Sequence, residues 1–354
     1  MLHFYKLFYS EADSLTGINH IYTIYIGVIF SIFGLLGNLV SIAVWKRINR
    51  KRCNDRKSAG VYLITLNVTD SCLLVLFLST EALQELMPSL IHGSYHGSYT
   101  FFYTHVGIPL FYWFFCTSVW IVVFLTLNRF IAVLFPLRSK RLNSLTNTYI
   151  IISVLFFLSL VLNIPRFYNY QISFISNSSV HEMFNQTQIK SFHSYEFGVQ
   201  CMFLLFSPFL IISVLNSLII LKLCQKTGVG ERSKRLLLSQ EKKTTLILMT
   251  VSISFLIFLM WQCASQCFWI IELESNDSND SKTYDLFHQF GILGIVINSS
   301  NNFILYCVSG MEFRKELYAI FKKQFKSTDK IGSNNTLNIF REKLNTSDGI
   351  LSKP

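Results

Sequence analysis

The sequence predicts an all-α membrane protein, a seven-transmembrane helix bundle followed by a short amphipathic cytosolic helix. Charged residues make up 14% of the chain and apolar residues 51%, whereas a water-soluble domain carries about 25% charged residues. Seven stretches are apolar over about 20 residues, the length that a helix needs to cross a bilayer. Backbone groups in lipid must be paired internally, so we expect these stretches to be helices of one bundle. The stretches are residues 21–45, 59–86, 102–134, 147–168, 197–223, 244–271 and 287–308.

Lysine and arginine predict the orientation of this bundle. The connection after the first stretch, KRINRKRCNDRK at 46–57, holds seven of these residues, and the second connection, near 87–101, holds none. Cytoplasmic connections of membrane proteins are the ones rich in basic residues. We therefore expect a multi-pass membrane protein with an extracellular N-terminus and a cytoplasmic C-terminus. The same distribution accounts for the net charge of +11 without a nucleic-acid partner.

The expected organisation has four parts. They are an extracellular N-terminus (1–20), the transmembrane domain (21–310), an amphipathic membrane-surface helix (311–325) and a disordered cytoplasmic tail (326–354). Within 311–325, Phe313, Leu317, Ile320 and Phe321 share one face and basic residues lie opposite. This pattern is typical of a helix that lies on membrane lipid.

Short motifs occur in order along the chain, with one motif in almost every expected helix. They are Gly37-Asn38, LNVTD ending at Asp70, NRFIAVLFP at 128–136, Pro208, Trp261, NSSNNFILYC at 298–307 and FRKEL at 313–317. This series resembles the rhodopsin-like (class A) G protein-coupled receptors. LNIPRFY at 162–168, and Phe303 where most members have proline, are most similar to the FMRFamide-receptor-like neuropeptide receptors. The resemblance implies a receptor that couples an extracellular peptide ligand to a heterotrimeric G protein, and it implies no enzymatic activity.

The chain departs from the family at several positions. Thr104 stands about where the family has the first cysteine of its outer disulfide, and residues 166–200 contain no cysteine. Phe156, Cys263 and Asn216 replace a tryptophan, a proline and a tyrosine of the family. These departures keep open an orphan receptor or a signalling-silent heterodimer partner with the same fold. A secondary transporter is the alternative from another class, but the two halves show no repeat.

Asp70 is the one carboxylate in the central parts of the expected helices. An ionisable group in the middle of a membrane is costly and indicates function. Asn298 and Asn302 are four residues apart and share a helix face. The family resemblance implies that Asp70, Ser118, Asn298 and Asn302 bind an allosteric sodium ion. A hydrogen-bonded network without a fixed ion is the alternative, and no other cofactor is expected.

Helical spacing predicts an outward-opening ligand pocket. Glu81 follows Asp70 by eleven residues, almost three helical turns, and Glu85 lies another turn further out. The other candidate pocket residues are Phe111, Phe115, Trp261, Ser265, Phe268 and His288. The two carboxylates predict a cationic peptide, for example one ending in Arg-Phe-amide. For the aromatic residues, packing between helices is the alternative. Amine receptors of the family carry an aspartate where this chain has Phe111, which argues against a biogenic amine.

The predicted G protein coupling and switch residues lie at the cytosolic side. They are Asn128, Arg129, Phe130, Asn302 and Tyr306. In the family a carboxylate precedes the arginine and helps to hold the cytosolic side shut. Asn128 is neutral, so we expect measurable signalling without agonist.

Two kinds of modification site are predicted. Asn177, Asn185, Asn276 and Asn279 match the N-x-S/T glycosylation pattern in expected outer loops. The hydroxyl residues of the tail are candidate sites for a receptor kinase, which would make arrestin a further partner. A linker without that role is the alternative.

Overall fold

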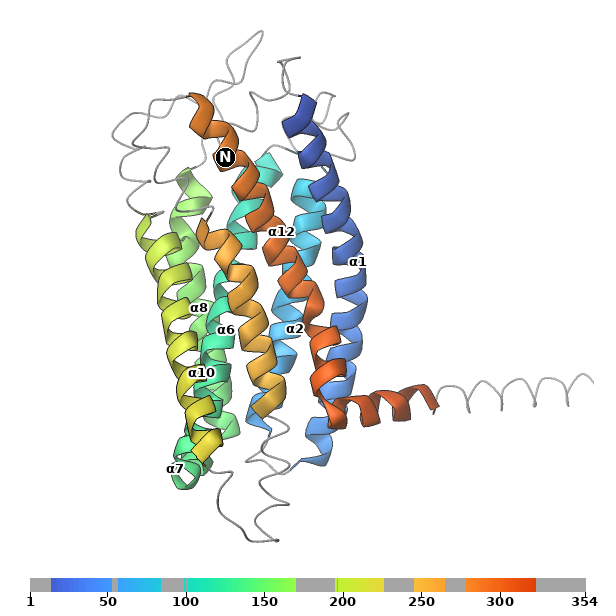
Figure 1. Cartoon of the computed structure of the whole chain (residues 1–354), viewed down its shortest axis with the longest axis vertical. Helices are drawn as coiled ribbons and strands as arrows, with labels where there is room; N and C mark the ends of the chain where they lie inside the picture. Colours follow the sequence, from blue (N-terminus) through green and yellow to red (C-terminus); the bar gives the residue numbers. More distant parts are fainter. Residues whose placement is uncertain are drawn as a thin grey trace, which may run out of the picture.

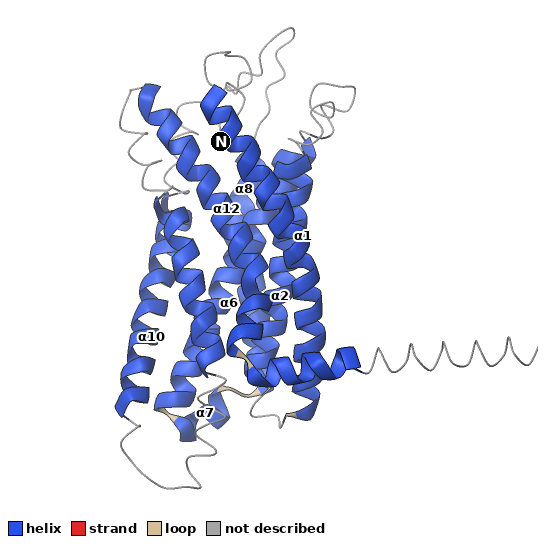
Figure 2. Cartoon of the chain, turned by 45° about the vertical axis from the view of Figure 1, so that its right-hand side comes forward, coloured by secondary structure: helices blue, strands red, loops and turns tan. Residues whose placement is uncertain are grey.

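The computed structural model is a bundle of long, steeply aligned helices (Figure 1). It describes residues 14–52, 57–83, 99, 101–169, 195, 197–225, 245–264 and 278–322. Within these ranges there is no strand, and the regular structure is helical throughout (Figure 2). The predicted fold class is therefore confirmed.

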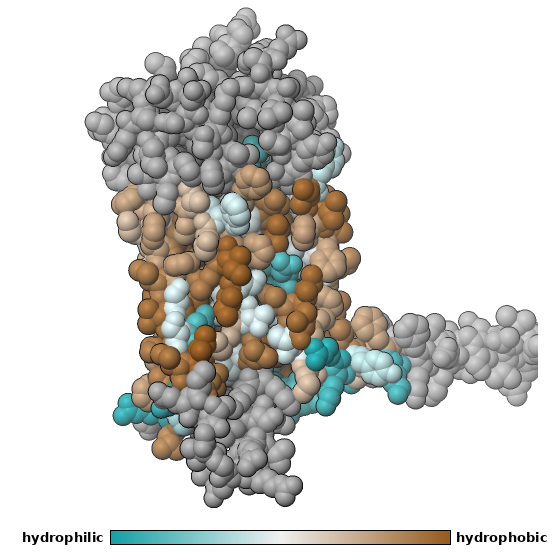
Figure 3. All heavy atoms as spheres, viewed as in Figure 1, coloured by the Kyte–Doolittle hydropathy of each residue, from teal (hydrophilic) through white to brown (hydrophobic). Residues whose placement is uncertain are grey.

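Seven described helices are long and apolar enough to cross a membrane. The helical elements are α1 (Ser14–Lys51), α2 (Ser58–Phe77) with the π-helical turn η3 (Leu78–Ala82), η4 (Tyr103–Gly107) leading into α6 (Ile108–Leu134), the short α7 (Pro136–Leu142), α8 (Leu145–Asn169), η5 (Phe197–Phe206) leading into α10 (Ser207–Gln225), Thr245–Ala264, and α12 (Ser278–Ser309). The surface of the middle of the bundle is predominantly hydrophobic, as expected for a lipid-facing belt (Figure 3). The chain is therefore a multi-pass membrane protein.

Helices α1 and α12 approach each other closely through two glycines of α1. A Cβ at Gly34 would stand 2.7 Å from the Cα of Ser300, and a Cβ at Gly37 would stand 2.8 Å from the Cβ of Phe303. Phe303 keeps the backbone N–H that a proline would lack, and α12 runs without a break from Ser278 to Ser309. The residue that departs from the family is thus part of the α1–α12 contact.

The departure at Phe156 is matched by a tryptophan on the neighbouring helix. Trp113 of α6 donates a hydrogen bond from Nε1 to the backbone oxygen of Phe156 in α8, at 2.9 Å. The two rings also meet edge to face, with centroids 6.4 Å apart. A tryptophan therefore joins α6 to α8, but its indole belongs to α6 and not to the position of Phe156 in α8.

The amphipathic helix leaves the end of α12 and runs sideways past the lower part of α1 and beyond the edge of the bundle, described over residues 311–322 (Figure 1). Phe313 is fully buried, with its ring 5.8 Å from that of Trp45 and 5.4 Å from that of Tyr306. Leu317 and Ile320 pack against the same core. These three residues therefore share one face, as predicted, and that face packs against the bundle, whereas Phe321 is 47% exposed. That this helix lies on membrane lipid stays a prediction.

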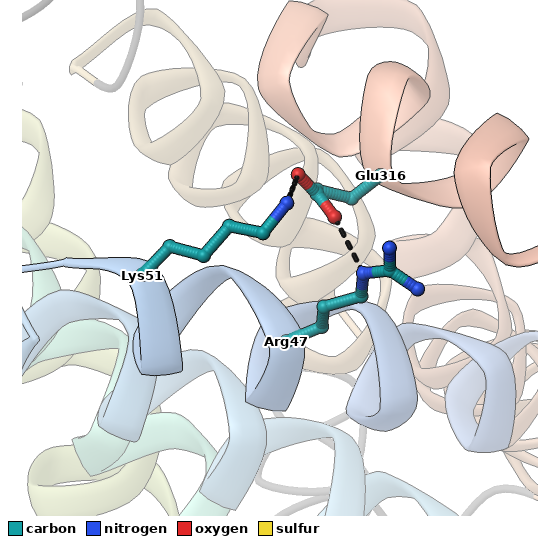
Figure 4. Close-up of polar contacts among 3 residues, drawn as sticks. All are labelled: Arg47, Lys51 and Glu316. Carbon is teal, nitrogen blue, oxygen red and sulfur yellow. Dashed lines mark hydrogen bonds and ion pairs between the residues drawn. The ribbon is translucent and has the colours of Figure 1, made fainter.

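Ion pairs hold this helix to the end of α1. Glu316 pairs with Arg47, whose Nε lies 2.8 Å from Oε2, and with Lys51 through its other oxygen (Figure 4). Arg52 forms a second pair with Glu312. Two carboxylates of the amphipathic helix thus neutralise part of the basic run that predicted the orientation.

Candidate ligand site and signalling core

Asp70 is fully buried and accepts three hydrogen bonds from two other helices. Ser118 of α6 donates to Oδ1 at 2.8 Å, Ser299 of α12 donates to Oδ1 at 3.3 Å, and Asn302 donates to Oδ2 at 2.5 Å. Burying a charge is costly unless it is paired or well hydrogen-bonded. The polar cluster therefore joins α2, α6 and α12 in the middle of the bundle.

The partner that α12 supplies beside Asn302 is Ser299, whereas the sequence pointed to Asn298. Asn298 is half-buried, and no hydrogen bond joins its side chain to Asp70 within the described part of the chain. Adjacent residues of a helix point about 100° apart, so a small rotation of α12 decides which of them faces Asp70. The sequence analysis placed Asn302 in the cluster around Asp70, where it donates a hydrogen bond, but did not single out Ser299.

The oxygen atoms of this cluster are of the kind that bind a hard cation. Such ions bind oxygen ligands, and Asp70, Ser118 and Ser299 bring carboxylate and hydroxyl oxygens together. Asn38 of α1 donates from Nδ2 to the backbone oxygen of Ser299 at 3.1 Å, while its own Oδ1 is buried without a hydrogen-bond partner. Oδ1 of Asn38, whose side chain binds the backbone of the Asp70 partner Ser299, is thus a further candidate ligand atom.

Glu81 lines a narrow cavity in the half of the bundle that the sequence predicts to face outward. The volume of the cavity that the centre of a water molecule can occupy is about 20 Å³. This is room for about one water molecule. The lining residues are Thr80, Glu81, Ile108, Phe111, Tyr112, Gln262, Ile292 and Ile295. Glu81 is half-buried in the π-helical turn η3, and Tyr103 donates from its hydroxyl to Oε1 at 3.0 Å. The predicted pocket residues Glu81 and Phe111 are thus brought together.

Two predicted wall residues lie elsewhere. Phe115 is buried in the helix core and does not line this cavity. Trp261 is 47% exposed and packs against Phe290, with centroids 5.9 Å apart. The next residue, Gln262, faces the cavity and is 1% exposed. Trp261 therefore stays a predicted ligand residue, while its neighbour Gln262 is the one that faces this cavity.

Several predicted residues fall outside what the structure describes. Glu85, Ser265, Phe268, Asn177, Asn185 and Asn276 lie outside the described ranges, and the side chain of His288 is not described. Asn279 belongs to the first turn of α12 rather than to a loop. Ser278, Asn279 and Asp280 are residue types that favour helix N-termini, which accounts for the earlier start of α12.

At the end of the bundle that the sequence predicts to face the cytosol, Asn128 belongs to a hydrogen-bond chain through three helices. Its Nδ2 donates to Ser58 Oγ of α2 at 2.9 Å, and Ser58 Oγ lies 2.7 Å from Thr148 Oγ1 of α8. Asn143 donates from Nδ2 to the backbone oxygen of Asn128 at 3.2 Å. Arg129 and Phe130, which follow on α6, are half-buried. Asn128, where the resemblance to the family leads one to expect a carboxylate, is therefore held by hydrogen bonds between uncharged groups.

Tyr306 is fully buried on the side of α1 and α2. Its hydroxyl accepts a hydrogen bond from Asn67 Nδ2 at 3.4 Å, and its ring meets that of Trp45 edge to face at 5.6 Å. In this arrangement the tyrosine predicted to line a G protein cleft lies within the core, under the amphipathic helix.

Asn216 forms a reciprocal pair with Ser252 that the sequence did not predict. Asn216 Nδ2 donates to Ser252 Oγ at 2.9 Å, and the oxygens Ser252 Oγ and Asn216 Oδ1 are 3.1 Å apart. Both residues are buried. The pair joins α10 to the helix Thr245–Ala264, so Asn216 also contributes to the packing of these two helices.

The fold and the buried polar core define a seven-helix membrane receptor. The family model for the 7 transmembrane receptor (rhodopsin family) matches residues 37–306. The chain belongs to this family, whose members are G protein-coupled signalling receptors and not enzymes.

Known relatives share modest identity with the chain. It is 24% identical over 313 residues to an FMRFamide receptor of Drosophila melanogaster, covering 85% of this chain and 54% of that protein. It is 22% identical over 307 residues to galanin receptor 2a of Danio rerio, covering 86% and 80%. Proteinase-activated receptor 1 of Xenopus laevis is 26% identical over 191 residues, covering 52% and 42%. The chain thus spans about half the length of the FMRFamide receptor.

Proposed function

We propose that this protein is a plasma-membrane receptor for a cationic extracellular peptide and that it activates a heterotrimeric G protein. Its N-terminus would lie outside the cell and its C-terminus in the cytosol, as the basic first connection indicates. Peptides that end in Arg-Phe-amide are one candidate ligand class. The names of the FMRFamide and galanin receptors support a neuropeptide.

The observation that carries this proposal is the place of Glu81. It lies within a membrane-spanning helix and lines a cavity whose walls are mostly apolar. Tyr103 engages one of its oxygens. A carboxylate in such a site strongly favours a cationic partner.

An allosteric sodium ion is the second part of the proposal. Asp70, Ser118 and Ser299 would hold it, with Asn302, Asn38 or the predicted Asn298 completing the oxygen ligands. Receptor kinase and arrestin would act on the tail after activation. Sodium would favour the arrangement of the helices that binds agonist less tightly.

The test is to screen an amidated-peptide library on cells that express the chain together with a panel of G proteins. The proposal expects a cationic peptide to activate at least one of them. If no peptide activates any G protein although the protein reaches the surface, a signalling-silent heterodimer partner becomes the better description. Cells without the receptor are the control.

A further inference from the structure

Gln262 is a buried amide with an unused hydrogen-bonding atom at the wall of the cavity. It is 1% exposed, and its Oε1 has no hydrogen-bond partner. A Cβ on Gly291 of α12 would lie 2.4 Å from this oxygen, so the side chain reaches α12 where a residue without a Cβ makes room. Buried amide groups are normally paired because an unpaired one is costly. Gln262 is therefore suited to accept a donor from a group that enters the cavity.

The other residues that line the cavity limit the chemical type of the group that can enter it. Glu81 is the carboxylate in the lining, with Oε1 already bonded to Tyr103, and the hydroxyl of Thr80 donates to the backbone oxygen of Leu76. The remaining walls are isoleucine and aromatic side chains. An entering group thus meets a carboxylate and an amide oxygen in apolar surroundings, and it should carry positive charge and several N–H donors.

A guanidinium meets these conditions better than an ammonium. It is planar, has five donors and no acceptor, and is more weakly hydrated than the ammonium of lysine. It also stacks on aromatic faces, which Phe111 can offer. The ring of Tyr112 already has a guanidinium over it, because Cζ of the buried Arg166 lies 3.7 Å from the ring centroid. An ammonium presents a compact, strongly hydrated charge, which is harder to transfer into a mostly apolar cavity.

We propose that Gln262 acts with Glu81 to select a ligand whose buried cation is an arginine guanidinium rather than a lysine ammonium. The inference rests on the proposed function as a receptor for a cationic peptide. Glu81 supplies the charge complementarity, and Gln262 supplies the uncharged acceptor that makes the site specific. The cavity has room for about one water molecule, so the side chains around it must move apart to admit the guanidinium.

The test measures binding of three dipeptide amides to the full-length receptor in lipid nanodiscs. Arg-Phe-amide, Lys-Phe-amide and the neutral citrulline-Phe-amide are titrated while the thermal unfolding midpoint is followed, because a ligand that binds the folded state raises it. We expect the arginine compound to bind about tenfold more tightly than the lysine compound, and the citrulline compound to show no binding. Gln262→Leu should reduce the arginine preference to about twofold or less.

Gln289→Leu is the matched control. Gln289 is also a buried glutamine with an unpartnered amide oxygen, at 8% exposure, but it does not line the cavity. It should keep the arginine preference. Equal affinity of the arginine and lysine compounds in the unmodified receptor, or a full preference in Gln262→Leu, would overturn the role of Gln262 while leaving a cationic ligand in place. Failure of both cationic compounds to bind would overturn the cationic ligand itself.

Discussion

Asn128 donates a hydrogen bond from Nδ2 to the hydroxyl oxygen of Ser58 at 2.9 Å, in the position that directly precedes Arg129. A carboxylate at this position can form an ion pair with the arginine, and an exposed pair contributes about 0.2–1 kcal/mol. The neutral amide offers no such pair. It contributes instead to a hydrogen-bond chain that also includes Thr148.

The first prediction is that Asn128→Asp lowers agonist-free signalling. The carboxylate can accept from the hydroxyl of Ser58, which reverses the direction of the present hydrogen bond. It also adds an ion pair with Arg129 that holds the predicted cytosolic side shut. Basal G protein activation should fall severalfold at matched surface expression, and agonist should still activate. Asn128→Ala is the control, because it removes the amide without adding charge and should not lower basal activity. Absence of basal signalling in the parent, or an Asp variant equal to it, would contradict the prediction.

The second prediction concerns the pair formed by Asn216 and Ser252. Ser252→Ala leaves the buried amide of Asn216 without its partner, at a cost of about 1–3 kcal/mol to the arrangement seen here. The resemblance to rhodopsin-like receptors implies that activation moves the helix Thr245–Ala264 outward. Loss of the pair should make this movement easier, so basal G protein activation should rise at least fivefold.

Ser217→Ala is the matched control for this pair. The hydroxyl of Ser217 is exposed and donates to the backbone oxygen of Ser213 within its own helix. Its removal should leave basal activity unchanged. Equal basal activity in Ser252→Ala and in the control would show that the pair does not restrain this helix.

The third prediction is that α1 tolerates no larger residue at Gly34. A Cβ there would meet the backbone of Ser300 at 2.7 Å, and overpacking of this kind costs about 1–3 kcal/mol. Gly34→Ala should lower the thermal unfolding midpoint and the amount of receptor at the cell surface. Gly198→Ala, where a Cβ has nothing within 4 Å, should have little effect. Equal stability of the two variants would argue against the close α1–α12 contact.

The fourth prediction concerns sodium. If the ion binds at Asp70 and favours the arrangement with lower agonist affinity, sodium and agonist each lower the apparent affinity of the other by the same factor. Replacing choline chloride with sodium chloride at constant ionic strength should weaken agonist binding. Asp70→Asn should abolish this dependence. A sodium effect that survives in Asp70→Asn would place the ion elsewhere.

The sequence predicted the helices and much of the polar core for clear physical reasons. Apolar stretches of about twenty residues imply helices that span a membrane. The position of Asp70 within one such stretch, and the shared helix face of Asn298 and Asn302, indicated a polar cluster. Rotations of helices within the bundle were less certain, because one residue corresponds to about 100°. Ser299 was therefore missed beside Asn298, and Gln262 beside Trp261.

The neutral hydrogen bonds had no signal in the sequence. Ser58, Thr148 and Ser252 are ordinary helix residues in one dimension, and their partners come from helices far away along the chain. Only the packing of the bundle brings these hydroxyl groups to Asn128 and Asn216. Residues that depart from the family are thus placed in contacts that a motif comparison does not reveal.

The most direct measurement of the central claim is the effect of Glu81→Gln on the potency of the peptide agonist found by the library screen. The substitution keeps the shape and the hydrogen bond to Tyr103 but removes the charge. Truncating one partner of a buried charge pair costs about 2–5 kcal/mol, so potency should fall at least tenfold at unchanged surface expression. Unchanged potency in Glu81→Gln, or a potent agonist without positive charge, would contradict a receptor that recognises its peptide through this carboxylate.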